Sequence, residues 1–424
     1  MSRRLPLVGW LAAEAVSLTG TRVSMIAIPW FVLTTTGSAT QTGLVAFAEM
    51  GPYVAAKALA GPVVDRVGAA RVAATADGAS VAVVGAIPLL HALDLLSFPL
   101  LLVLVAVAGT MCGPADGAKH ALVPAIAETS GQSMERVTGL AGAAERLAST
   151  AGAAFAGVLV ALIGPAQALV VDAASFGLSA LLIATTAPRR LAEPPDESEE
   201  SYLRRLREGW DFLRRDRVLV AITVMVGATN LLDQAYIAVL VPVWARESGG
   251  GAAVIGLLFA VFSGASLLGS VVAAGWAERL PRFKTYLFAF LLCGAPRFVV
   301  LALDLPLTAV LTTAAVGGFA SGFINPILGA VIFERIPPHL VGRVNSLITS
   351  LCWAGIPFGG VVGGVLIAGF GLSPALLVAG AAYLVATMLP AVRPEWRDID
   401  RPSPTRSDGS RDIAVAGTTA TSRD

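Results

Sequence analysis

Several ionisable side chains lie inside long apolar segments of the sequence, where a charge is costly unless it is paired, hydrated or functional. The most notable are four acids, Asp233, Glu14, Glu49 and Glu145, together with Arg22 in the same segment as Glu14. Burial disfavours the charged form of a carboxylate, so a carboxylate in this setting is easily protonated. These five residues are therefore our candidates for a site that exchanges protons beside an aqueous cavity.

The intramembrane charges do not balance, because the acids outnumber the bases. The acids that we place within apolar segments are Glu14, Glu49, Asp77, Glu145, Asp172 and Asp233, and the bases are Arg22, Lys57, Arg146 and Arg297. A surplus of carboxylates predicts that some of them face water or carry a proton. Structural alternatives remain open: Glu145 and Arg146 as an internal ion pair, Glu14 as an interface carboxylate, and Arg22 as a fixed counter-charge.

Polar and aromatic residues beside these charges are candidates for lining a substrate cavity. Asn230 and Gln234 flank Asp233 within one apolar segment. Phe31 is one of several aromatic side chains able to form an apolar wall of the cavity. For any single aromatic residue, ordinary packing explains the position equally well. We predict Phe31, Asn230 and Gln234 as cavity residues.

The sequence offers no pattern typical of an enzyme. The three cysteines are far apart within apolar runs, the histidines fall at segment ends, and no Gly-x-x-x-x-Gly-Lys-Ser/Thr loop occurs. These absences argue against a metal centre, a bound cofactor and ATP hydrolysis by this chain. We therefore expect a protein that is not an enzyme and needs neither metal nor cofactor.

The elements that position these residues follow from composition. The chain has 424 residues, of which 55% are hydrophobic and only 14% charged, with a mean hydropathy of +0.75. A soluble domain carries about 25% charged residues, so this chain cannot cover a water-facing surface. The net charge of +1 also shows no excess of basic residues of the kind that binds nucleic acid. The composition indicates an integral membrane protein with many spans.

Twelve membrane-spanning helices fit the apolar part of the chain, since each needs about 20 residues plus a connection. Their predicted ranges are 7–34, 40–64, 71–93, 97–122, 136–163, 165–187, 217–243, 252–277, 284–303, 306–332, 342–369 and 373–391. With both termini inside, most of the basic residues, Lys119 among them, fall in cytoplasmic segments. We therefore expect a multi-pass protein of the cell inner (plasma) membrane with both termini cytoplasmic.

The spans divide into two equal groups, which predicts a duplicated six-helix unit. The expected organisation is an N-terminal bundle at 1–187, a cytoplasmic linker at 188–216, a C-terminal bundle at 217–391 and a disordered cytoplasmic tail at 392–424. The linker contains an amphipathic segment, with a basic face and an apolar stripe formed by Leu203, Leu206, Trp210 and Leu213. That pattern suits a helix lying on an anionic membrane surface.

A short polar loop closes the second predicted span, with the sequence Gly-Pro-Val-Val-Asp-Arg-Val-Gly-Ala-Ala-Arg. Gly61 permits close helix approach and Gly68 a tight turn, while Asp65 can meet a helix N-terminus and Arg66 and Arg71 anchor the cytoplasmic side. The loop resembles the signature of the major facilitator superfamily, Gly-x-x-x-Asp-Arg-x-Gly followed by a basic residue. The resemblance implies that this loop acts in gating.

Other segments carry the resemblance further. The run Ile-Pro-Trp-Phe-Val-Leu at 28–33 and the segments at 336–344 and 356–360 are similar to the multidrug and macrolide-efflux branch, which includes an enterobactin exporter. The resemblance implies an all-α fold of twelve transmembrane helices in two pseudo-symmetric bundles, alternating access, and proton-coupled secondary export, normally by a monomer. The chain departs from the family pattern in span four, where the residues from Thr110 to Gly113 include no arginine, and in span five, which lacks the Gly-Pro motif.

Three functions are compatible with this reading. The first is secondary active export of amphipathic organic compounds such as drugs or antibiotics, driven by protons. The second keeps the transporter fold but is dedicated to one native metabolite, a siderophore or a self-made antibiotic. The third is a membrane sensor or assembly partner that transports nothing, for which the basic linker helix would be the docking surface.

Overall fold

Every regular element in the described part of the chain is helical. The computed structural model describes residues 4–188, 202–276, 281–337 and 340–392. The helices before the linker are α1 (Leu5–Thr36), α2 (Ala39–Leu59), α3 (Gly61–Val67), α4 (Ala69–Ala92), α5 (Phe98–Ala121), α6 (Val123–Ser130), α7 (Met134–Ile163) and α8 (Pro165–Thr186). In lipid, helices satisfy their own backbone polar groups, so this architecture agrees with the predicted all-α membrane fold.

The second part of the chain repeats this arrangement with more interruptions. Its elements are α9 (Tyr202–Leu213), α10 (Arg217–Ala235), a π-helical turn (Tyr236–Leu240), α11 (Val241–Glu247), α12 (Gly251–Trp276), α13 (Arg282–Cys293), α14 (Ala295–Ala302), α15 (Leu307–Ser321), α16 (Ile324–Arg335), α17 (Val341–Ala354), α18 (Ile356–Phe370) and α19 (Leu372–Val392). Three predicted spans of this half are each built from two successive helices, namely 284–303, 306–332 and 342–369. Gly294 divides the first of them and Gly355 the third. Each of these glycines is followed within two residues by a proline, which removes a backbone donor and interrupts a helix.

Eleven of the predicted spans are helical segments long and apolar enough to cross a membrane, within the residues that the structure describes. The second predicted span corresponds to α2, which is less apolar because it includes Gln41, Glu49 and Lys57. It nevertheless packs closely against α5 on one side and α18 on the other. The chain is therefore a multi-pass membrane protein, and α2 completes the expected set of twelve segments.

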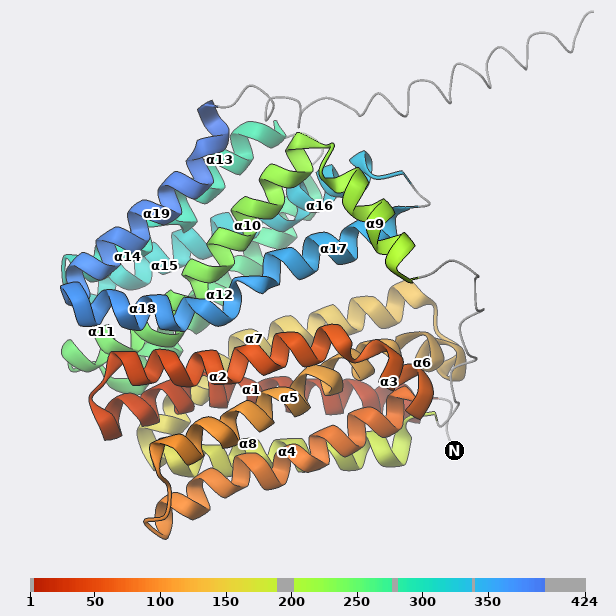
Figure 1. Ribbon diagram of the computed structural model, residues 1–424, viewed down its shortest axis with the longest axis horizontal. Coiled ribbons are helices and arrows are strands. Elements are labelled where there is room, and N and C mark those ends of the chain that lie inside the picture. Colours follow the sequence, from red (N-terminus) through yellow and green to blue (C-terminus); the bar gives the residue numbers. More distant parts are fainter. Residues whose placement is uncertain (1–3, 189–201, 277–280, 338–339, 393–424) are drawn as a thin grey trace, which may run out of the picture.

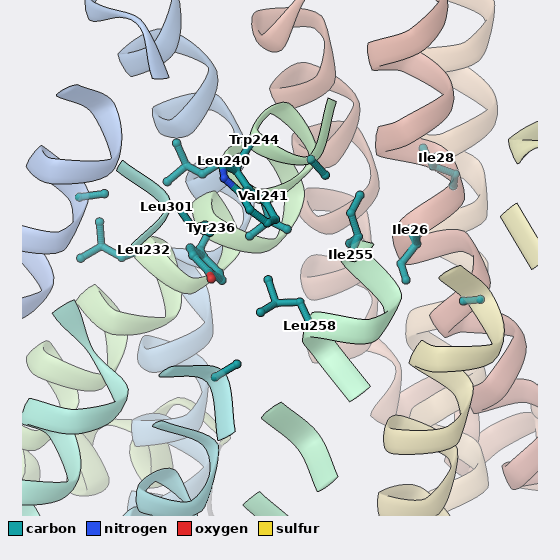
Figure 2. Packing of buried hydrophobic residues seen from close by; sticks show 14 of the residues in the cluster. Ile26, Ile28, Leu232, Tyr236, Leu240, Val241, Trp244, Ile255, Leu258 and Leu301 are labelled. Carbon is teal, nitrogen blue, oxygen red and sulfur yellow. The ribbon is translucent and has the colours of Figure 1, made fainter. Parts of the chain in front are cut away.

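Two helix pairs dominate the packing of the two halves of the chain against each other. Helix α2 contacts α18, and α7 contacts α12, so that in Figure 1 the first half lies below and the second half above. A buried apolar cluster crosses this junction. It includes Ile26 and Ile28 of α1, as well as Tyr236, Ile255 and Leu258 from the second half, and Figure 2 shows these residues converging between the helices.

Close backbone approach between glycines marks both contacts. A Cβ atom added to Gly157 would lie 2.6 Å from the Cα atom of Gly256, and one added to Gly360 would lie 2.9 Å from the carbonyl oxygen of Gly43. At the same end of the molecule, Arg246 of α11 donates a hydrogen bond of 3.1 Å to the carbonyl oxygen of Leu33 in α1. Small residues allow helices to pack this closely in membranes.

The opposite end of the molecule, which carries α3, α6 and α9, is more open. The helices of the two halves diverge toward this end, which we call the α3/α9 end (Figure 1). Leu140 and Leu147 of α7 are exposed there, as are Ser346 and Ser350 of α17. The conformation is therefore closed at one end and open toward the α3/α9 end.

The predicted linker helix is present as α9, which spans Tyr202–Leu213. Its Trp210 is exposed and its Leu213 is buried against α10 and α17. The side chains of Leu203 and Leu206, the linker residues 189–201 and the tail from residue 393 lie outside what the structure describes.

Candidate functional site

A polar pocket of about 320 Å³ lies between the two halves, where α7 faces α12 and α16. Glu145 and Ser149 line it from α7, Ser263 and Ser266 from α12, and Asn325 from α16. Most of the lining side chains are able to donate or accept hydrogen bonds. Because a single pocket collects polar groups from both halves, it is a candidate segment of a path for small molecules.

Glu145, predicted from the sequence, lies in this pocket together with Arg146. The alternative of an internal ion pair between them is not realised in the described residues, since both side chains are exposed and no ion pair joins them. Arg22 reaches the same region from α1, because its Nη2 atom donates a hydrogen bond of 2.8 Å to Ser149 Oγ. Arg22 therefore sits beside the pocket with its charge directed to α7.

Glu14 is buried in α1, with only 7% of its surface exposed. Its Oε2 atom accepts no hydrogen bond within the described residues. The charges that act on it belong to Lys119, Asp116, His120 and Glu145. A buried carboxylate oxygen without a donor is costly when charged, so this position favours a group that binds a proton.

Lys119 forms the centre of a buried network near Glu14. Its Nζ atom lies 2.8 Å from Asp77 Oδ2 and donates a 2.8 Å hydrogen bond to Ser17 Oγ. Ser179 Oγ donates a 2.6 Å hydrogen bond to the same carboxylate oxygen of Asp77. Lys119 was expected in a cytoplasmic segment, but it is 1% exposed within α5. It thus supplies a base in the span where no arginine was found.

A second charged cluster lies where α2 faces α17. Tyr53 donates a 2.6 Å hydrogen bond to Asp116 Oδ2, and Lys57 donates one of 2.9 Å to the Tyr53 hydroxyl. The Lys57 ammonium is 3.6 Å from Asp116 and 4.9 Å from the centre of the Trp353 ring. This cluster connects α2 and α5 of the first half with α17 of the second.

Asp233, our first candidate in α10, forms an ion pair with Arg297 of α14. The guanidinium carbon of Arg297 also lies 4.7 Å, 5.0 Å and 4.9 Å from the ring centres of Tyr236, Phe298 and Tyr383. Arg297, one of the bases predicted within apolar segments, is thus the partner of a candidate site residue. The π-helical turn begins three residues after Asp233, and such turns are frequent at functional sites.

The remaining cavity candidates are placed separately. Asn230 donates a 3.0 Å hydrogen bond to the carbonyl oxygen of Cys352, which ties α10 to α17. Gln234 is half-buried beside Gly359, and Glu49 is half-buried in α2. Phe31 is buried, with its ring edge-on to His91 at 4.9 Å between centroids. Of the proton-exchange and cavity candidates, only Glu145 lines the polar pocket itself, with Arg22 adjacent.

The predicted gating loop lies at the α3/α9 end. Asp65 and Arg66 are exposed at the end of α3, and Arg71 is exposed in the first turn of α4. Gly68 has a φ of +94°, a conformation that side-chain-bearing residues rarely adopt, as the predicted tight turn requires. The close helix approach expected at Gly61 is absent, since a Cβ atom there would meet no atom within 4 Å.

Sequence reasoning missed Asp116, which lies inside the predicted fourth span. The signal was available, because Tyr53 and Lys57 are four residues apart on one helical face and Asp116 and Lys119 are three apart. Within the described ranges, no three His, Cys, Asp or Glu side chains come together in a way that would hold a metal ion.

Comparison with known proteins places the chain in a family. The model of the Major Facilitator Superfamily matches residues 10–232 and again residues 223–419. The multidrug efflux pump Tap of Mycobacterium tuberculosis is 33% identical over 95% of this chain and 98% of the relative. The macrolide efflux protein A of Streptococcus pyogenes is 22% identical over 92% of this chain and 96% of the relative.

Solved structures agree on the fold. The nucleoside transporter NupG superposes with a TM-score of 0.74 over 94% of this chain and 100% of its own, at 14% identity. A D-xylose-proton symporter gives 0.64 over 90% and 96%, also at 14% identity. The helices, the polar pocket between the halves and these matches define a membrane transporter. The chain belongs to the major facilitator superfamily, as the loop at residues 61–71 predicts.

Proposed function

We propose that this chain is a secondary active exporter of amphipathic organic compounds, including drugs, and that it is driven by protons. Export of drugs is supported by the relatives named as a multidrug efflux pump and a macrolide efflux protein, both of which align over nearly their whole length. The polar pocket between α7, α12 and α16 then forms part of the substrate path, because it lies between two halves that can rock against each other.

The proposed organisation is two six-helix bundles at 1–187 and 217–391, joined by a cytoplasmic linker. The α3/α9 end is assigned to the cytoplasm because basic residues, such as Arg66, Arg71 and Arg215, gather there. Both termini are then cytoplasmic, the chain acts as a monomer in the plasma membrane, and the conformation described above is the inward-facing one.

Proton coupling is assigned first to Glu14. The observation that carries this assignment is its buried carboxylate with an Oε2 atom that accepts no hydrogen bond among the described residues. The nearby base, Lys119, is already engaged by Asp77 and Ser17, so it does not fully neutralise Glu14. In the conformation described here, which is open toward the α3/α9 end, Glu14 is still buried, and burial favours its protonated form. The proton is exchanged when the two halves rock and water reaches this carboxylate.

Everted membrane vesicles with an imposed pH gradient test both parts of the proposal. Uptake of a fluorescent amphipathic dye is compared among the wild type, Glu14→Gln and the matched control Glu135→Gln, whose side chain is exposed at the start of α7. We expect gradient-driven uptake in the wild type and the control, and a loss of at least about tenfold in Glu14→Gln.

The outcomes separate the proposals. Unchanged uptake in Glu14→Gln overturns the assignment of Glu14, and Asp233→Asn and Glu145→Gln are then the next variants to test. Dye uptake whose rate does not depend on the pH gradient overturns proton coupling. Transport of one native metabolite with no competition by dyes would favour a dedicated exporter over a multidrug one.

A further inference from the structure

An apolar groove of about 600 Å³ runs between α10 and α17 and is covered at one end by α9. Val224 and Ala228 line it from α10, Leu351 from α17, and Trp210 and Leu213 from α9. Its volume lies in the range of cavities that hold small molecules. The groove is separate from the polar pocket between the halves, with which it shares no residue.

The groove opens on the outer surface of the helix bundle. Leu351 precedes Trp353 by two residues, so the two side chains point to nearly opposite sides of α17. Trp353 faces Lys57 across the junction of the halves, and Leu351 therefore faces away from that junction. Val224 is 66% exposed, while the next residue, Met225, points about 100° further around α10 and is buried in the core. In a membrane protein, such an exposed apolar face contacts lipid acyl chains.

The mouth of the groove is basic. Arg214 lines it, and its side chain is 58% exposed, while Arg215 next to it is exposed as well. The acids in this segment form ion pairs with arginines. Asp211 lies 2.7 Å from Arg214, and Asp216 lies 3.3 Å from Arg335. Glu208 lies 2.7 Å from Arg343. With its acids neutralised in this way, the segment presents a surplus of positive charge to the surroundings.

The apolar groove and its basic mouth complement the acyl chain and the negatively charged headgroup of an anionic phospholipid. We propose that this groove binds one acyl chain of an anionic phospholipid from the bilayer, with the headgroup phosphate at Arg214 and Arg215. A guanidinium has five donors, so Arg214 can hold both Asp211 and a phosphate. Trp210, which is 45% exposed beside the groove, suits the boundary between headgroups and acyl chains. Such a lipid would hold α9 against α10 and α17.

Fluorescence quenching by brominated lipids tests this directly. The purified full chain is reconstituted in phosphatidylcholine nanodiscs, and increasing amounts of phosphatidylglycerol with brominated acyl chains are added. The chain has seven tryptophans, so the signal of Trp210 is obtained as the difference between the wild type and Trp210→Phe. We expect saturable quenching, half-complete at a phosphatidylglycerol fraction at least about fivefold lower than for brominated phosphatidylcholine, since one arginine near anionic lipid gives about that preference.

Two variants and a control separate the parts of the site. Arg214→Gln with Arg215→Gln should remove the preference for phosphatidylglycerol, and Ala228→Phe should fill the groove and weaken quenching by both lipids. Ala381→Phe, at an exposed position of α19, should change neither. Equal quenching of wild-type Trp210 by the two brominated lipids overturns the proposal. Unchanged quenching by both lipids in Ala228→Phe overturns it as well. Displacement of the lipid by an amphipathic drug at micromolar concentration would instead assign the groove to substrate.

Discussion

The ammonium nitrogen of Lys57 lies 4.9 Å from the centre of the Trp353 ring, which joins α2 of one half to α17 of the other. The same ammonium donates a hydrogen bond to Tyr53 and lies near Asp116, so its position is fixed from the side of the first half. Trp353 is therefore the part of this contact that must separate when the two halves move. A cation–π pair of this kind is strong enough to bias the motion without preventing it.

Replacing Trp353 by Leu should reduce the population of the conformation described here. The cation–π contact contributes about 0.5–2 kcal/mol, enough to change the ratio of two conformations severalfold. Spin labels at Leu140 of α7 and Ser346 of α17, both exposed at the α3/α9 end, report the distance between the halves. Trp353→Leu should increase the share of short distances, whereas Trp276→Leu, at an exposed position of α12, should not. If Trp353→Leu and Trp276→Leu gave the same distance distribution, the contact between Lys57 and Trp353 would not affect the ratio of the two conformations.

The contact between α7 and α12 should not tolerate even one methyl group. Gly157→Ala places a Cβ atom 2.6 Å from the Cα of Gly256, and overpacking of this kind costs about 1–3 kcal/mol. We expect a lower melting temperature and slower dye transport. The control, Gly139→Ala, lies on the same helix where a Cβ meets nothing within 4 Å, and it should be neutral or slightly stabilising. If the two variants melt alike, the two helix backbones are not in contact at this point.

Removing the charge of Lys119 should destabilise the first half strongly. Lys119→Met leaves the buried Asp77 carboxylate without its base, and breaking one partner of a buried pair costs about 3–5 kcal/mol. The double variant with Asp77→Leu should regain much of that stability, because no buried charge then remains unpaired. Thermal unfolding in detergent measures both. A double variant that is less stable than Lys119→Met alone would contradict this account.

Arginine should not be replaceable by lysine at position 297. The planar guanidinium of Arg297 lies within 5.0 Å of three aromatic ring centres while it pairs with Asp233, and an ammonium cannot stack on rings in this way. Arg297→Lys should therefore lower the melting temperature nearly as much as Arg297→Met. Arg136→Lys, at an exposed position of α7, serves as the matched control and should leave it unchanged. Full stability in Arg297→Lys would mean that charge alone suffices.

Much of the fold could be predicted from the sequence because long apolar helices in lipid leave few alternatives. The ranges of most spans and the turn at Gly68 follow from local patterns. The divided spans are visible only in retrospect, since Gly355 and Pro357 interrupt a helix without making the segment less apolar. The polar residues that lower the hydropathy of α2 have a physical setting too, because Glu49 and Lys57 are half-buried in this helix, which packs between α5 and α18.

The partners of the charged residues could not be predicted in the same way. Asp77 and Lys119, or Asp233 and Arg297, come from helices that are distant in sequence, and only the packing of the bundle brings them together. Lys119 lies inside the predicted fourth span, 97–122, but it was assigned to a cytoplasmic segment because it is close to the end of that span. Individual titratable residues were therefore identified more readily than the networks that decide which of them keeps its charge.

At Gly157 and Gly256 the two backbones touch directly, with no side chain between them. Interlocking side chains could let one helix slide along the other by small rotamer changes. Two backbones in direct contact have no side chains there that could adjust in this way. The halves must therefore part there as stiff bodies that roll about a shared line, and a lever of this kind transmits a small tilt at one membrane face into a large one at the other.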